Sequence, residues 1–181
     1  ICASVNEEVV HGIPSSRRLQ EGDIISIDVG VGFADFFADA AITVGVGRIS
    51  KDEQKLIDVT YQALSRAIKQ AKVGNYVSDI SYAVQSYVES RGFSVVRQFV
   101  GHGIGRSLHE EPEIPNFGRP RKDERLGAGM VLAIEPMVNA GSWEVRILDN
   151  GWTAVTADGK PSAHFEHTVA VTEKGPVILT S

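Results

Sequence analysis

Residues 18–28 read Arg-Leu-Gln-Glu-Gly-Asp-Ile-Ile-Ser-Ile-Asp, and residues 125–135 read Arg-Leu-Gly-Ala-Gly-Met-Val-Leu-Ala-Ile-Glu. The two stretches align without a gap: Arg, Leu, Gly and Ile are identical, and the other strand positions carry conservative changes. An acid ends each copy, Asp28 in the first and Glu135 in the second. We therefore expect two related halves, each delivering one carboxylate from an equivalent strand to a shared central site.

The first copy leads into a predicted hairpin. Residues 23–31 form a short apolar run between Gly22 and the turn region at Gly30 and Gly32, which indicates a buried strand. Residues 36–46 form the expected return strand. This pairing lets Asp39 face Asp28 across the hairpin, so two acids share one sheet.

The rest of the chain alternates helices and strands and then continues with strands alone. Ser50 to Glu53 has the form of a capping box, and apolar residues at helical spacing predict a helix to about Lys72. A second helix is predicted from about Ser78 to Gly92. Further strands are expected at 93–100, 130–134, 145–148, 152–155, 165–171 and 177–179, with a surface loop at 110–125. The pattern favours one α+β domain over residues 1–181.

Composition narrows the class of protein. The 181 residues are 43% hydrophobic, and 18 Lys and Arg oppose 23 Asp and Glu without a basic run, which argues against nucleic acid as a partner. The single cysteine, Cys2, excludes an intrachain disulfide framework and fits a reducing compartment. No apolar stretch approaches the roughly 20 residues that a membrane-spanning helix needs. The chain opens at Ile1 without an initiator Met, so we expect that upstream sequence, and part of the first half, is missing.

Four acids lie in or beside apolar strand runs: Asp28, Asp39, Glu135 and Glu166. Each one alone is more simply explained as a surface or turn residue. Burying four ionised carboxylates together costs several kcal/mol per group unless cations compensate them, so the set as a whole favours a metal cluster. An oxygen-rich cluster suits two divalent ions about 3.5 to 4 Å apart, and hydrolysis is the natural chemistry of such a pair.

Histidines add to this set. His102 lies between Gly101 and Gly103, which let backbone or substrate approach closely, although His102, His109 and His11 would each more often be structural when taken alone. The glycine string is no phosphate loop, because Arg106 takes the last glycine position of the dinucleotide motif and no Lys-Ser/Thr pair follows. We interpret His164 and His167 as structural or surface residues.

Several motifs together resemble type I methionine aminopeptidases of the pita-bread fold. They are residues 6–14 (Asn-Glu-Glu-Val-Val-His-Gly-Ile-Pro), 101–106 (Gly-His-Gly-Ile-Gly-Arg), 109–112 (His-Glu-Glu-Pro), 134–137 (Ile-Glu-Pro-Met) and 165–168 (Phe-Glu-His-Thr), in the family's order over nearly the whole chain. The resemblance implies pseudo-two-fold halves with a curved antiparallel sheet and flanking helices. It also implies removal of the initiator methionine from nascent proteins and peptides with a small second residue.

The resemblance also implies a role for each matching residue. Two divalent ions (Co, Mn, Fe, Zn or Ni) would be held by Asp28, Asp39, His102, Glu135 and Glu166, with Asp39 and Glu166 bridging. Glu135 would also handle the proton of the attacking water, His109 would contact the scissile carbonyl or amide, and His11 would hold the substrate backbone. The methionine pocket would be lined by Cys2, Leu108 and Trp152. Leu108 departs from the family's aromatic residue at its position, and Ala40 departs from the usual hydroxyl residue.

Two other hypotheses remain open at this point. A proline-directed aminopeptidase shares the fold and the ligands, and a non-catalytic binding module can be built on the same fold. The resemblance further implies a cytoplasmic monomer that acts on the N-terminus of a peptide or nascent chain, with possible transient ribosome contact and with organellar targeting left open. It leaves open the role of the loop at 113–125.

Overall fold

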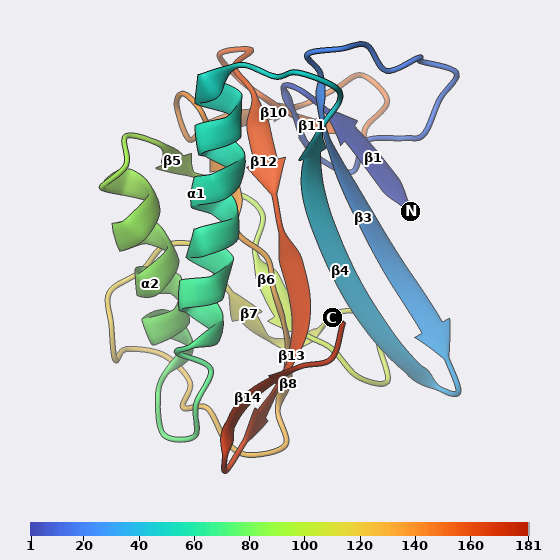
Figure 1. The fold of residues 1–181 in the computed structure, drawn as a ribbon. Coiled ribbons are helices and arrows are strands. Elements are labelled where there is room, and N and C mark those ends of the chain that lie inside the picture. Colours follow the sequence, from blue (N-terminus) through green and yellow to red (C-terminus); the bar gives the residue numbers. More distant parts are fainter. Residues whose placement is uncertain (181) are drawn as a thin grey trace.

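The predicted hairpin is present as β3 (Ile24–Phe33) and β4 (Phe36–Gly45), the two long strands at the right of Figure 1. Their antiparallel register runs without a break from Ile24 opposite Gly45 to Phe33 opposite Phe36. These bounds come from a computed structural model, which describes residues 1–180. The prediction of a strand over 23–31 with its return over 36–46 is therefore confirmed.

The second copy of the repeat builds a second hairpin. Its first strand is β8 (Val131–Ile134), which pairs with β13 (Glu166–Thr172). The same register continues into β9 (Met137–Asn139) and β12 (Ser162–His164). Ile25 lies opposite Val44 in the first hairpin, as Leu132 lies opposite Val169 in the second. The outgoing strands thus correspond at an offset of 107 residues (25 to 132) and the return strands at an offset of 125 (44 to 169).

The turn that enters each hairpin has the same backbone conformation. Gly22 has φ +99° and Gly129 has φ +94°, in the left-handed region that glycine adopts without steric cost. Gly22 donates its N–H to the carbonyl of Val46. Gly129 donates its N–H to the carbonyl of Val171, which lies 125 residues after Val46. The repeat read from the sequence is therefore a structural repeat.

Both hairpins belong to one antiparallel sheet. The strand order is β1 (Cys2–Val5), β3, β4, β13, β8, β6 (Gly101–Gly103) and β7 (Glu110–Ile114), and β14 (Gly175–Ile178) adds to β13. The hairpins meet where β4 lies against β13, with Glu166 opposite Ala41 and His167 opposite Ala40. Residues far apart in the sequence are in this way brought together at the centre of the sheet (Figure 1).

Two helices and two small sheets complete the fold. Helix α1 (Lys51–Ile68) begins at the predicted capping box of Ser50 and Glu53, and α2 (Val77–Glu89) packs beside it (Figure 1). Their apolar faces share one buried cluster with the second hairpin. One small sheet has the strand order β10 (Val145–Ile147), β11 (Ala154–Thr156) and β2 (Glu8–Val10). The other has the strand order β12, β9 and β5 (Ser94–Val95). Within residues 1–180, neither helix is long and apolar enough to cross a membrane.

Two expectations about this part of the chain were wrong in detail. The surface loop expected over 110–125 begins with a strand, because Glu110–Ile114 is β7 at the edge of the main sheet. Prolines suggested a loop, but an edge strand tolerates a residue without an N–H donor, and Pro112 occupies such a strand. The strand expected over 93–100 is limited to Ser94–Val95. The other elements lie within a few residues of their predicted positions.

Candidate metal centre

The five predicted ligands come from five neighbouring segments of the main sheet. Asp28 lies in β3, Asp39 in β4, His102 in the middle of β6, Glu135 directly after β8, and Glu166 at the start of β13. Because these strands are adjacent or nearly so, the sheet itself brings acids from both halves together.

Three of the five form the tightest group. One ligand atom each of Asp39, His102 and Glu166 lies within 4.8 Å of the other two, and all three residues are buried. Glu135 adjoins them, with its Oε1 3.5 Å from Nε2 of His102. Asp28 completes the set, since Asp39 and Glu135 are close enough for their charges to raise its pKa.

The electrostatics of this group are those of crowded, desolvated acids. Burial raises the pKa of Glu166 well above its ordinary value, and the charges of Glu135, Asp39 and Asp28 raise it further. Burial also raises the pKa of Asp28 to about 6, with His164 opposing the shift and Asp39 and Glu135 adding to it. Among the residues that the structure describes, the buried Oε1 of Glu166 has no hydrogen-bond partner. A cation among these oxygens would remove the repulsion and satisfy that atom, so the donor set fits divalent metal ions.

Close backbone packing fixes His102. A side-chain carbon on Gly101 would lie 2.4 Å from the carbonyl oxygen of Ala133, and one on Gly103 would lie 2.1 Å from that of Glu111. Only glycine therefore fits on either side of the histidine. The register of β6 against β7 shifts between His102 and Gly103, an irregularity of the kind that re-aims side chains near active sites.

A threonine of the opposite hairpin holds Asp39. The hydroxyl of Thr168 accepts a hydrogen bond from the Asp39 N–H at 2.9 Å and donates one to the Asp39 carbonyl at 2.8 Å. Space remains above this carboxylate because Gly30 lies opposite Asp39 in the register. A side-chain carbon at Gly30 would lie 3.5 Å from Leu108 and 3.7 Å from Asp39, which places Leu108 beside the group.

The predicted substrate-binding residues lie around the four acids and the single imidazole of the proposed ligand set. The rings of His109 and His102 are 4.3 Å apart between centroids. Cys2 lies directly opposite Asp28 in the register of β1 and β3, and burial raises the pKa of its thiol. The ring of His11 stacks on Trp152 at 5.0 Å and 27°. The structure thus places Cys2, Leu108 and His109 beside proposed ligands and stacks His11 on Trp152.

The backbone and environment of His11 are unusual. Its φ is +61°, which is uncommon for a residue with a side chain, and its carbonyl accepts a hydrogen bond from the Thr153 hydroxyl. Burial lowers the pKa of the imidazole, the charges of His164 and His109 lower it further, and Glu135 opposes the shift. Burial therefore disfavours the protonated form of the His11 imidazole.

Sequence reasoning missed one residue of this region. His164 is only 1% exposed, so it is not on the surface, and its Nε2 lies 3.5 Å from Oε2 of Glu135. A signal was available: Thr43-Val44-Gly45-Val46 and Thr168-Val169-Ala170-Val171 extend the repeat to the return strands. His167, by contrast, pairs its Nδ1 with the Thr180 hydroxyl at 3.0 Å, which agrees with a structural role.

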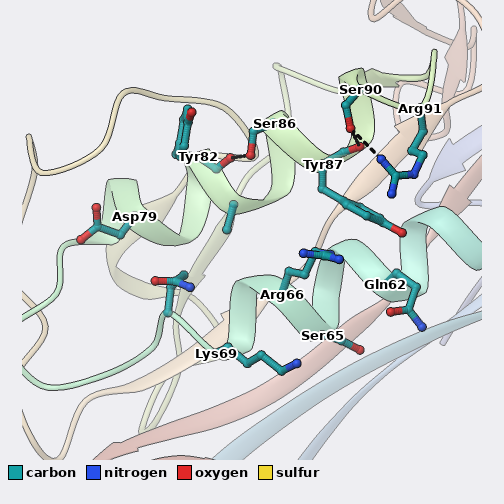
Figure 2. Close-up of a pocket in the computed structure, with 12 residues that line it drawn as sticks. Gln62, Ser65, Arg66, Lys69, Asp79, Tyr82, Ser86, Tyr87, Ser90 and Arg91 are labelled. Carbon is teal, nitrogen blue, oxygen red and sulfur yellow. Dashed lines mark hydrogen bonds between the residues drawn. The ribbon is translucent and has the colours of Figure 1, made fainter.

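A cavity lies away from this region, between the outer faces of α1 and α2. It measures about 680 Å³ and is lined by polar side chains of both helices (Figure 2). Figure 2 shows Arg66 and Arg91 on either side of Tyr87, with their guanidinium carbons 4.3 and 4.4 Å from the ring centroid. None of the predicted site residues lines this cavity. The cluster of acids, rather than the size of a cavity, therefore locates the candidate site.

Comparisons with known proteins agree with the geometry. The profile of Metallopeptidase family M24 matches residues 1–173. The chain is 59% identical to a methionine aminopeptidase of Clostridium perfringens, covering 99% of this chain and 72% of that protein. It is 58% identical to methionine aminopeptidase 1 of Bacillus subtilis, covering 99% and 73%.

Solved structures give the same assignment. The crystal structure of methionine aminopeptidase from Thermotoga maritima matches with a TM-score of 0.98 at 51% identity, over 99% of this chain and 73% of that one. A prolidase from Pyrococcus furiosus matches with a TM-score of 0.80 at 23% identity, over 99% and 48%, which shows a shared fold alone. The predicted pita-bread fold is confirmed. The chain belongs to metallopeptidase family M24 and, within it, to the methionine aminopeptidases.

Proposed function

We propose that this chain removes N-terminal methionine with a pair of divalent metal ions, which Asp28, Asp39, His102, Glu135 and Glu166 would hold. The observation that supports the pair is the convergence of four carboxylates and one imidazole from both halves of the sheet. One divalent cation would compensate only half of the four negative charges, whereas two would balance them. When bound, the ions supply Lewis-acid polarisation of the scissile carbonyl and an acidified water. Co, Mn, Fe, Zn and Ni are all candidates, since oxygen-rich sites accept several first-row ions.

Glu135 is the proposed general base. Its carboxylate lies between two imidazoles, 3.5 Å from His102 and 3.5 Å from His164, so it is confined at the centre of the site. From there Glu135 can take a proton from the attacking water and return it to the leaving amine. Burial of this kind excludes bulk water and strengthens every charge interaction in the site.

The remaining residues are proposed to place the substrate. His109, against His102, contacts the carbonyl of the bond to be cleaved, and His11 holds the substrate backbone. Cys2, Leu108 and Trp152 line the pocket for the methionine side chain, an apolar surface suited to a flexible thioether. A free amino terminus would bind at the proposed ions, and this would account for cleavage at the first residue rather than within a chain.

Chelation tests the proposal directly. Purified protein should lose hydrolysis of a Met-Ala-Ser peptide on treatment with a chelator and regain it with divalent metal, and an N-acetylated copy of the peptide should not be cleaved. Titration of the metal-free protein should show two ions per chain. Activity that survives chelation, or a single ion at saturation, would contradict the two-ion site.

Two alternatives are separated by simple comparisons. A proline-directed aminopeptidase would cleave an Ala-Pro peptide faster than a Met-Ala peptide, and we expect the reverse. A non-catalytic binding module would take up no divalent ions in calorimetry.

The proposed setting is the cytoplasm, because the one cysteine is free. There a monomer would act on nascent chains with transient ribosome contact, because the proposed substrate is a new N-terminus.

A further inference from the structure

His164 is a buried polar residue that takes no chemical step in the proposed mechanism. Its Nε2 is buried and has no hydrogen-bond partner within residues 1–180. Leaving such an atom unpaired costs about 1 to 3 kcal/mol, so an imidazole kept in this place calls for an explanation.

The repeat gives His164 a defined counterpart. The return strands correspond at an offset of 125 residues, as in Val44 to Val169, and the same offset carries Asp39 onto His164. Met137 lies opposite His164 just as Gly30 lies opposite Asp39. In the second half, His164 therefore occupies the position of Asp39.

The two positions are also held in the same way. The hydroxyl of Thr43 accepts a hydrogen bond from the His164 N–H at 2.8 Å and donates one to the His164 carbonyl at 2.8 Å. Thr168, the residue 125 positions after Thr43, makes the matching pair of bonds to Asp39 at 2.9 and 2.8 Å. Each hairpin thus fixes one residue of the other, and His164 faces the same side of the sheet as Asp39.

What His164 reaches on that side is Glu135. Its Nε2 is 3.5 Å from Oε2, while His102 approaches Oε1 of the same carboxylate at 3.5 Å. His164 does not join the group of Asp39, His102 and Glu166 whose ligand atoms gather within 4.8 Å among the described residues. His164 lies beside a proposed ligand, and carboxylates that bind metal ions are commonly oriented by hydrogen bonds from neighbouring side chains.

We propose that His164 is a positioning residue whose Nε2–H donates to Oε2 of Glu135 and holds that carboxylate for its two roles. This inference rests on the proposed function of Glu135. The separation of 3.5 Å is about 0.5 Å longer than a good N–H···O bond, and hydrogen bonds of this kind often shorten when substrate is bound. With the bond made, one carboxylate oxygen is fixed and the other is left for ion and water.

Substitutions at His164 separate positioning from packing. His164→Leu removes the donor, whereas His164→Gln places an amide N–H near the position of Nε2. We expect His164→Leu to lower both kcat on Met-Ala-Ser and divalent-ion affinity by roughly 10- to 100-fold with little change in KM. His164→Gln should recover most of both. His167→Leu is the matched control, since that ring bonds to Thr180 instead, and it should leave kcat and ion affinity near their original values.

The readouts distinguish this inference from the proposed function. Ion affinity is measured by calorimetry on metal-free protein, alongside Asp39→Asn. If Asp39→Asn loses ion binding while His164→Leu keeps normal kcat and affinity, the positioning role fails and the metal site stands. If both variants keep normal ion affinity, the metal site itself is wrong. A His164→Gln variant as impaired as His164→Leu would overturn the donor role. Complete loss of one ion in both His164 variants would make His164 a ligand instead.

Spectroscopy gives a test that needs no substitution at His164. In the unmodified protein, ¹⁵N-labelled histidine should show the His164 proton on Nε2, and Glu135→Gln should shift that resonance. A proton on Nδ1 alone, or no response to Glu135→Gln, would overturn the inference.

Discussion

The two hairpins share a register but differ in what covers them. Val169 in the second hairpin is 0% exposed, because α1 and α2 pack on its outer face, whereas its counterpart Val44 is 41% exposed. The outer face of the first hairpin continues with Val31, 52% exposed, and Phe33, 83% exposed. The strand pattern is the same in both halves, so burial is decided by the helices rather than by the strands.

The halves also differ in the groups that they bring to the centre. The first contributes Asp28 and Asp39. The second places Glu135 at the position of Asp28 but an imidazole, His164, at the position of Asp39, and its Glu166 corresponds to Ala41. The repeat therefore supplies a symmetrical framework, and the chemistry depends on the positions where the copies differ.

The strongest test of this asymmetry is removal of one charge at Asp39. Asp39→Asn keeps the shape of the side chain but takes a negative charge from the centre of the cluster. We expect activity to fall by more than the roughly 100-fold that loss of an outer-shell partner causes, with loss of ion binding. Asp35→Asn, in the exposed hairpin turn, is the isosteric control and should have no effect. Near-normal activity of Asp39→Asn at limiting metal would refute its role.

The threonine bonds between the hairpins provide the next test. Thr168→Val leaves the buried N–H and carbonyl of Asp39 without partners, and Thr43→Val does the same to His164. Each should cost about 1 to 3 kcal/mol of unfolding free energy, measured by urea denaturation of metal-free protein. Thr168→Val should weaken ion binding more, since it loosens a proposed ligand directly. Equal ion affinity in the two variants would show that the clamps act on stability alone.

The sequence predicted the internal repeat better than it predicted how the two halves are covered. Alignment of the outgoing strands paired Asp28 with Glu135, and the register confirms that equivalence. His164 was missed because the offset changes from 107 to 125 between the outgoing and return strands, so a single alignment does not reach it. The Thr-Val-x-Val match in both return strands is short, and only the register gives it meaning.

The covering of the two halves could not be predicted at all. Apolar alternation shows that a strand has one apolar face, but not which helices lie on it, because helix packing depends on connections across the whole fold. The edge position of β7 could not be predicted from the sequence either. Pro112 suggests a loop until it is known that β7 pairs with β6 alone.

A pair of isosteric substitutions measures the difference in covering. Val169→Thr places a hydroxyl against the helices and should cost about 1 to 3 kcal/mol of unfolding free energy, since no partner is at hand. Val44→Thr, at the equivalent exposed position, should change it by about 0.5 kcal/mol or less. Urea denaturation of the two variants gives the comparison. Equal costs would mean that the outer face of the first hairpin is buried in solution.

The smallest expected effect concerns the pKa of His11, whose ring stacks on Trp152. Burial is the main cause of its lowered pKa, so the native protein binds a proton at His11 less readily than the unfolded chain does. That difference destabilises the native state as the pH falls below about 6.5, the ordinary value for histidine, and has no effect well above it. Trp152→Ala should raise the pKa of His11 toward 6.5, as measured by NMR titration of metal-free protein, and should lessen the loss of stability in acid. An unchanged pKa in Trp152→Ala would show that Trp152 does not supply the burial that lowers it, which would leave Phe99, 5.4 Å from His11 between ring centroids, as the covering group.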